Sequence, residues 1–377
     1  MYIFVGVLGL LALLLTLWDA FETIILPRRV TRSFRLVRLF YLVSWKTWSA
    51  ISRWMRPVRK RESYLSYYGP LSLLFLFAFW AITLVVSFAV VQWAIGSELA
   101  TPGNTFPNDL YLSGSTFFTL GLGDVLPHTR MARVITIGES GVGFGFLAVV
   151  ISYLPTLYGA FSQRELNISL LDARAGSPPT AAELLRRHAH FSNLDPITDL
   201  LRDWEIWSAQ LMESHLSYPV LCYFRSQHDN QSWLAAFTVV LDVSSLIISY
   251  SSGVAKWQAQ MTFAISRHAI VDIAEVLRVH PIAPRLNRLP PGDLEKVRKL
   301  LLECGAPRCS DAGDAKLKEL RAMYEGYLNG LSARLLMALP SWGVEPQFVE
   351  NWKRSAWGRI SSSATGDATT PQGVPEH

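Results

Sequence analysis

Three long apolar segments lie in the first half of the chain, separated by polar stretches. Residues 2–18 and 64–97 carry no charged side chain, and residues 134–161 carry only Glu139. A helix needs roughly 20 apolar residues to cross a bilayer, and each of these three segments is long enough to do so. The pattern predicts three transmembrane helices.

A strongly basic stretch, residues 28–63, separates the first two apolar segments. Basic loops stay on the cytoplasmic side of a membrane, so this stretch is expected inside the cell and the N-terminus outside. Asp19 and Glu22, at the inner end of the first segment, are expected to pair with nearby arginines. The basic residues are Arg28, Arg29, Arg32, Arg35, Arg38, Lys46, Arg53, Arg56, Arg59, Lys60 and Arg61, beside the acidic Glu62.

Part of the basic stretch has a pattern of its own. Residues 34–55, FRLVRLFYLVSWKTWSAISRWM, interleave Arg and Lys with Leu, Phe and Trp at roughly helical spacing. Such an amphipathic helix is typical of segments that lie in the headgroup layer of an anionic leaflet. The sequence therefore predicts membrane lipid as a partner. A voltage sensor is disfavoured, because its arginines recur inside a span.

A glycine-spaced turn lies between the second and third apolar segments, in STFFTLGLGDVLP (residues 115–127). The preceding residues predict a short helix that dips back into the membrane, with Asn108 or Asp109 as its N-cap. Non-helical backbone at membrane depth survives only where it lines a watery path or is buried in protein. Gly121 and Gly123 permit backbone angles that turn successive carbonyls toward one axis, where they replace the water around a cation.

Span, short helix, TLGLGD and span, over roughly residues 66–160, resemble the pore module of the potassium channel family. The filter of that family reads Thr-Val-Gly-Tyr-Gly-Asp in its commonest form. The resemblance implies an all-α membrane protein that conducts K⁺ passively, needs no cofactor beyond the permeant ions, and assembles as a homotetramer. One filter segment per chain supplies only a quarter of the ring.

The resemblance also assigns roles within the six-residue filter. Thr119 supplies the innermost ion site with its hydroxyl and carbonyl, and Gly123 ends the filter. Leu120, Gly121 and Leu122 supply carbonyls, and Asp124 sits behind the outer mouth. Leu122 stands where an aromatic residue is usual, which leaves the coordinating carbonyls in place but changes the stiffness of the filter. A weakly selective cation channel is therefore the alternative.

Further residues are expected to support the filter. Tyr111 stands where the family usually has a tryptophan that bonds the filter aspartate, so a bond from Tyr111 to Asp124 is expected; the alternative is an interfacial aromatic. Ser115 is a second supporting candidate. Glu139 is a third, because a charged residue inside a span is a functional candidate by default, although it is close enough to the surface to snorkel.

The third span carries candidates for gating and for the inner cavity. Gly143 stands at the spacing from the filter where the family often has a hinge glycine, and Pro155 is expected to kink the helix near the cytoplasmic mouth. Phe144, Leu147 and Ile151 share one face and are expected to line the cavity. Packing between helices explains these three equally well.

The second half, residues 162–360, predicts a helical cytoplasmic domain. SPPTAAELLRR reads as a proline linker and a helix start with Thr180 as cap and Glu183 three residues on. Residues 232–250 are nearly long enough to span, but Asp242 and several serines favour a buried helix instead. Residues 361–377 have the composition of a disordered tail.

Composition narrows the function classes. Half of the 377 residues are hydrophobic and 12% are aromatic, as membrane spans require, and a net charge of +5 is too modest to indicate nucleic-acid binding. The three cysteines give no disulfide framework. The sequence also has no metal-ligand cluster or nucleotide-binding motif that would indicate a gating ligand. A membrane-anchored enzyme or scaffold is the remaining alternative, but no catalytic constellation supports it. The sequence thus favours a potassium channel of the cell membrane, with its C-terminal domain inside.

Overall fold

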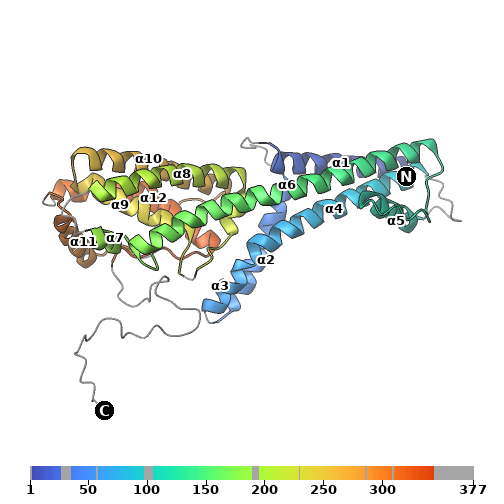
Figure 1. Cartoon of the computed structure of the whole chain (residues 1–377). Helices are drawn as coiled ribbons and strands as arrows, with labels where there is room; N and C mark the ends of the chain where they lie inside the picture. The colour runs from blue at the N-terminus through green and yellow to red at the C-terminus, as the bar shows by residue number, and fades with distance from the viewer. Residues whose placement is uncertain are drawn as a thin grey trace, which may run out of the picture.

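A computed structural model of the chain describes residues 2–26, 35–56, 58–96, 105–188, 195–228, 230–284, 287–307 and 310–343. Helices, and no β-strand, make up the regular structure of these residues, which confirms the predicted all-α class. Figure 1 shows a part built from long helices and a compact helical bundle, joined by α6 (Arg130–Ala175). The expected tail, 361–377, lies outside the described residues.

The three predicted spans correspond to α1 (Tyr2–Ile24), α4 (Tyr68–Ile95) and α6. In their most apolar stretches, 22% of α1 and 11% of α6 is buried within the chain, so most of these apolar side chains face outward. Lipid or other protein chains must cover them in place of water.

Helices α1 and α4 pack closely along one another (Figure 1). A Cβ added at Gly6 would lie 2.8 Å from the Ala94 Cβ, and one added at Gly9 would lie 2.8 Å from the Val90 Cγ1. Because positions that rise along α1 meet positions that fall along α4, the two helices are antiparallel. Glycine at these contacts lets the backbones approach as small residues do in membrane helix pairs.

The acidic end of α1 holds the start of α2 (Leu36–Trp54). The Asp19 carboxylate accepts hydrogen bonds from the backbone amides of Leu36 and Val37, both at 3.0 Å, and from Trp80 Nε1 at 3.1 Å. Glu22 pairs with Arg35 at 3.7 Å. The expected arginine pairing holds for Glu22. Asp19, on which the charge of Arg35 also acts, serves as an anion at a helix N-terminus, where free N–H groups favour negative charge.

Helix α2 lies between the spans and the bundle and is followed by α3 (Val58–Ser66). On one face, Trp45 Nε1 donates to the Arg334 carbonyl of the bundle at 2.9 Å, and the Tyr41 ring stacks on Tyr223 with ring centres 5.9 Å apart. Leu42 and Val43 on the other side are about half exposed. The helix thus joins the bundle on one face and leaves apolar side chains exposed on another.

Helix α6 is continuous over 46 residues, or about 69 Å at 1.5 Å per residue. It begins where the Ala132 amide bonds to Thr129 Oγ1 at 3.1 Å and ends at Gly176, whose φ of +83° suits glycine. The helix passes through Pro155 and through residue 161, the expected edge of the pore domain. It therefore connects the apolar part of the chain to the bundle without a linker.

The bundle surrounds α9 (Trp233–Tyr250), in which every side chain but Ser249 is buried. Asp242 in this helix accepts hydrogen bonds from Arg288 at 2.8 and 2.9 Å and from the Tyr324 hydroxyl at 2.7 Å. The structure thus makes residues 232–250 a core helix, as expected. Around it lie α7 (Ala181–His188), α8 (Asp195–Ser217), the 3-10 turn η2 (Pro219–Tyr223), α10 (Gly253–Val276), α11 (Pro291–Glu303) and α12 (Asp311–Leu335).

Candidate ion pore

A short helix, α5 (Phe106–Phe117), lies between α4 and α6 (Figure 1). It begins earlier than expected: Thr105 is the N-cap, and it makes no side-chain capping bond. Asn108 and Asp109 are therefore not the cap, and the buried Asp109 lies in the first turn. Pro107 was the signal for this earlier start, because proline is favoured in the first turn of a helix.

The chain leaves the helical conformation after α5 and regains it at Arg130. In this interval Thr119, Gly121 and Gly123 have positive φ, of 56°, 61° and 78°, while the leucines between them do not. Left-handed backbone at every second residue turns successive carbonyl groups in a common direction. The cost of such angles is smallest for glycine, which occupies two of the three positions.

Residues 119–124 have little cover from their own chain. Leu120 and Leu122 are each 62% exposed, and a Cβ built at Gly121 or at Gly123 would have no described atom within 4 Å. The segment, which connects α5 to α6, is therefore an open surface in a single copy of the chain.

Tyr111 and Asp124 lie together at the outer end of this segment. The Tyr111 hydroxyl lies close enough to the Asp124 carboxylate to interact with it. Asp124 Oδ1 accepts from the Val125 amide at 3.1 Å. The two residues that the sequence analysis joined are thus adjacent in the structure, on α5 and after the turn.

Ser115 contacts the segment through its backbone. Its carbonyl accepts a hydrogen bond from the Leu120 amide at 2.8 Å, and the Thr116 carbonyl accepts from the Thr119 amide at 3.0 Å. These bonds tie the start of the non-helical segment to the last turn of α5. They satisfy carbonyls that the end of a helix leaves without partners.

Glu139 lies behind α5 rather than at the segment itself. Its side chain is fully buried, and it hydrogen-bonds to the hydroxyl of Ser113, which also lies 2.7 Å from the Val85 carbonyl. A hydroxyl donates one proton and a carbonyl only accepts, so both bonds form when the Glu139 carboxyl carries the second proton. The sequence analysis missed Ser113; its signal is a small polar residue among the apolar positions of α5.

Gly143 is the place where α6 touches the end of α5. A Cβ added there would lie 2.1 Å from the Phe117 carbonyl oxygen and 3.0 Å from its Cα, which no side chain can occupy. Gly141 and Gly145, on the same helix, would meet no described atom within 4 Å. The structure therefore gives Gly143 a packing role directly beside the segment, in addition to any role as a hinge.

Phe144, Leu147 and Ile151 form an outward face on α6. Their exposed fractions are 69%, 56% and 62%, so packing within one chain does not use them. Pro155 continues this exposed face one turn further along. The expected cavity-lining residues thus share a surface that the single chain leaves open.

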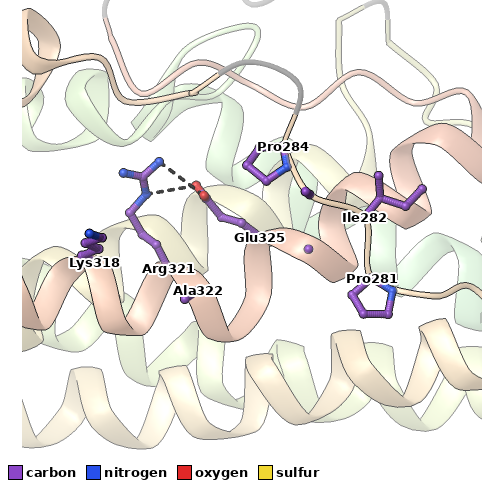
Figure 2. Close-up of a pocket in the computed structure, with 9 residues that line it drawn as sticks. Pro281, Ile282, Pro284, Lys318, Arg321, Ala322 and Glu325 are labelled. Atoms are coloured by element: carbon purple, nitrogen blue, oxygen red, sulfur yellow. Dashed lines mark hydrogen bonds and ion pairs between the residues drawn. The ribbon is translucent and has the colours of Figure 1, made fainter.

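No group of three or more His, Cys, Asp or Glu side chains suited to a metal ion occurs in the described ranges. The bundle has a hollow of about 390 Å³ between α12 and residues 281–284, shown in Figure 2. Lys318 and Arg321 border it, and Arg321 is ion-paired with Glu325 at 3.1 Å. Glu325 balances one of these two cations, and it also pairs with Arg288 at 3.2 Å.

Comparison with known proteins supports the pore interpretation. Residues 73–158 match a protein family described as "Ion channel". A Bacillus subtilis (strain 168) protein described as "Uncharacterized membrane protein YdjJ" is 22% identical over 243 residues, which cover 64% of this chain and 68% of that protein. No solved structure matches the chain. The matched range takes in most of α4, all of α5, the TLGLGD segment and the first part of α6. The chain is thus a membrane protein, and its residues 73–158 are a pore domain of the ion channel family.

Proposed function

We propose that this protein is a potassium channel in which four copies surround one pore and residues 119–124 form the selectivity filter. Conduction is passive and needs no cofactor beyond the permeant K⁺. The ion channel family supports a transport role rather than an enzymatic one. The protein sits in the cell membrane, with its N-terminus outside and its bundle in the cytoplasm, as the basic stretch favours.

The observation that carries this proposal is the backbone of TLGLGD. Positive φ at Thr119, Gly121 and Gly123 alternates with ordinary backbone at the two leucines. Carbonyls that point in a common direction can replace the hydration shell of a cation. The Ser115 carbonyl, which accepts from the Leu120 amide, holds one end of this segment, and Tyr111 lies near Asp124 at the other.

The open surface of the segment supports a ring of several copies. One chain leaves Leu120 and Leu122 mostly exposed and offers carbonyls from one side only. Four identical segments around an axis enclose an ion and cover the leucines against neighbouring chains, as closed cyclic symmetry allows. The outward face of Phe144, Leu147 and Ile151 would then line the cavity below.

A weakly selective cation channel is the second candidate, and Leu122 favours it. Its side chain has no polar atom with which to hold the filter from behind, and it is 62% exposed in one chain. A less constrained filter adapts to ions of different size. The two candidates share the pore and differ only in the ratio of K⁺ to Na⁺ permeability.

A pair of glycine variants tests whether TLGLGD is the filter. Gly121→Ala places a side chain at a φ of +61°, which costs about 1–2 kcal/mol per copy, and four added methyl groups crowd one axis. We expect no single-channel current from Gly121→Ala in planar bilayers and normal current from Gly141→Ala, whose added methyl meets no described atom within 4 Å. Normal current through the Gly121→Ala protein would refute the assignment.

A further inference from the structure

Beyond its apolar part, α6 buries three charged side chains and exposes two leucines. Arg164, Glu165 and Asp172 are only 2%, 7% and 6% exposed, whereas Leu166 and Leu170 are 60% and 55% exposed. A helix at the surface of a soluble domain ordinarily turns its apolar face inward and its charges to water. Here the bundle buries the three charged side chains together with Ile168 and Leu171, and leaves Leu166 and Leu170 outside.

The buried charges are fixed by specific bonds within the chain. Arg164 pairs with Glu165 at 2.9 Å and donates to the carbonyls of Leu221 and Phe224 at 2.9 and 3.1 Å. Asp172 accepts a hydrogen bond from Ser177. Rotating α6 to expose its charges would break these bonds and leave buried polar atoms unpaired, so the orientation of the helix is set.

The outward face carries no charge for several turns. We call it the α6 neck; its exposed residues are Ser162, Gln163, Leu166, Ser169, Leu170 and Ala173. They recur at the three- and four-residue spacing of one helix face. The face continues the stripe of Phe144, Leu147 and Ile151 without interruption, because α6 has no break between them. The next charge on this face is Arg174.

A groove lies beside the neck and has a mixed lining, with Arg174 and Asp203 as well as apolar side chains. It has a volume of about 300 Å³ between α6 and α8, and Leu170 and Ile206 lie on its two walls. Ile206 is 56% exposed. Two helices thus contribute large apolar side chains to a surface that faces water in a single chain, which is typical of an interface.

We propose that the α6 neck is an interface between copies of this chain, in which four α6 helices continue past the membrane as a bundle around the pore axis. Leu166 and Leu170 contact the neighbouring copy there. This inference rests on the proposed function, because that function brings Phe144, Leu147 and Ile151 to the axis, and the continuous helix brings the neck to the same side.

The chemistry of the neck fits a symmetric assembly. Around a four-fold axis each side chain meets three copies of itself, so a charge would be repeated four times at close range. The neck has none until Arg174. Ser162, Ser169 and Ala173 are small enough for helix backbones to approach, and depletion of charge marks the core of protein interfaces.

Cysteine cross-linking in membranes tests this contact in the full-length protein. We expect Leu166→Cys to form a disulfide-linked dimer under mild oxidation, because each chain then offers one thiol next to that of its neighbour. The matched control is Met323→Cys on α12, 39% exposed and away from the neck. The unaltered protein is the second control, because it shows whether a native cysteine links two chains; Cys222 and Cys304 are fully buried, and Cys309 lies outside the described residues.

A charge at the same position tests whether the contact stabilises the assembly. Leu166→Glu would bring four carboxylates together, and we expect the tetrameric fraction in native mass spectrometry to fall at least tenfold. Met323→Glu should leave it unchanged. Circular dichroism of both variants shows whether the helices remain folded, and Leu166→Ser provides a milder variant if the glutamate prevents folding.

The outcomes separate this inference from the channel proposal. If the unaltered protein conducts K⁺ as a tetramer but Leu166→Cys gives no more dimer than Met323→Cys, the neck interface is wrong and the channel stands. Cross-linking of Leu166→Cys to a different protein would also overturn it. If the protein neither conducts nor forms tetramers, the proposed function fails, and the neck inference fails with it.

Discussion

The core of the bundle and the TLGLGD segment differ in how many of their contacts a single chain supplies. In α9, Asp242 is 1% exposed and receives hydrogen bonds from Arg288 and Tyr324, so its own chain completes it. Residues 119–124 connect α5 to α6 and leave Leu120 and Leu122 62% exposed. The hydrogen bonds and burial of the first region are complete within one chain. The second region is left uncovered by its own chain, as expected of a segment that contacts other copies.

This difference predicts which substitutions unfold the protein and which abolish conduction. Changes in the bundle act on the stability of each chain, because the contacts are internal. Changes beside the segment act on conduction, because the segment does little to hold a single chain together. The following variants test the distinction in order of expected effect.

The largest effect on stability is expected from Arg288→Met. This change leaves Asp242 buried without its bidentate partner, which costs about 3–5 kcal/mol when a buried ion pair loses one member. Thermal unfolding followed by tryptophan fluorescence should show a large fall in Tm. Arg202→Met, at an exposed pair with Asp199, is the control and should change Tm little. Equal Tm values for the two variants would contradict the account.

Gly143→Ala should act on the pore instead. The added methyl would overlap the Phe117 carbonyl and displace the end of α5, at a cost of about 1–3 kcal/mol per copy. We expect reduced current and altered block by larger cations, because Phe117 precedes Thr119 by two residues. Gly145→Ala has open space and serves as control. A change in open probability alone, with unaltered block, would instead favour the hinge function.

Two variants of Glu139, which lies behind the pore, are expected to have smaller effects on the current, and the effects should differ between the two. Gln at position 139 keeps an oxygen and adds an N–H that can donate to Ser113, so Glu139→Gln should retain near-normal current. Glu139→Ala leaves a cavity and removes the partner of Ser113, at a cost of about 1–3 kcal/mol. Single-channel recordings of both variants separate a neutral bonded carboxyl from an essential negative charge, for which the Gln variant would also fail.

The smallest effect expected is on pH dependence in the bundle. Burial, and then the charge of Arg164, holds the pKa of His215 well below its usual value. A depressed histidine pKa means that the folded state binds fewer protons than the unfolded state, so His215 lowers stability as pH falls below about 6.5. His215→Gln should flatten the decline in Tm between pH 7 and pH 5. An unchanged slope would show that His215 does not contribute to it.

Local patterns in the sequence were sufficient to predict the spans, the short helix and the glycine-spaced segment. These features depend on runs and spacings of neighbouring residues. Asp242 and the serines around it were likewise enough to predict that residues 232–250 are buried in the bundle.

Contacts between distant residues were not predictable in the same way. Nothing near Gly143 shows that Phe117 lies against it, and nothing near Asp19 shows that it binds the amides of Leu36 and Val37. The burial of Arg164, Glu165 and Asp172 on α6 also depends on where the bundle packs. The roles of the filter residues rest on resemblance and remain predictions.

The most direct test of the proposed channel is the reversal potential of the purified protein in a planar bilayer, with KCl on one side and NaCl on the other. Carbonyl coordination at TLGLGD predicts a reversal potential displaced from zero in the direction of K⁺ selectivity. A potential near zero with measurable current would favour the weakly selective channel. The absence of any current from correctly inserted protein would contradict the pore account.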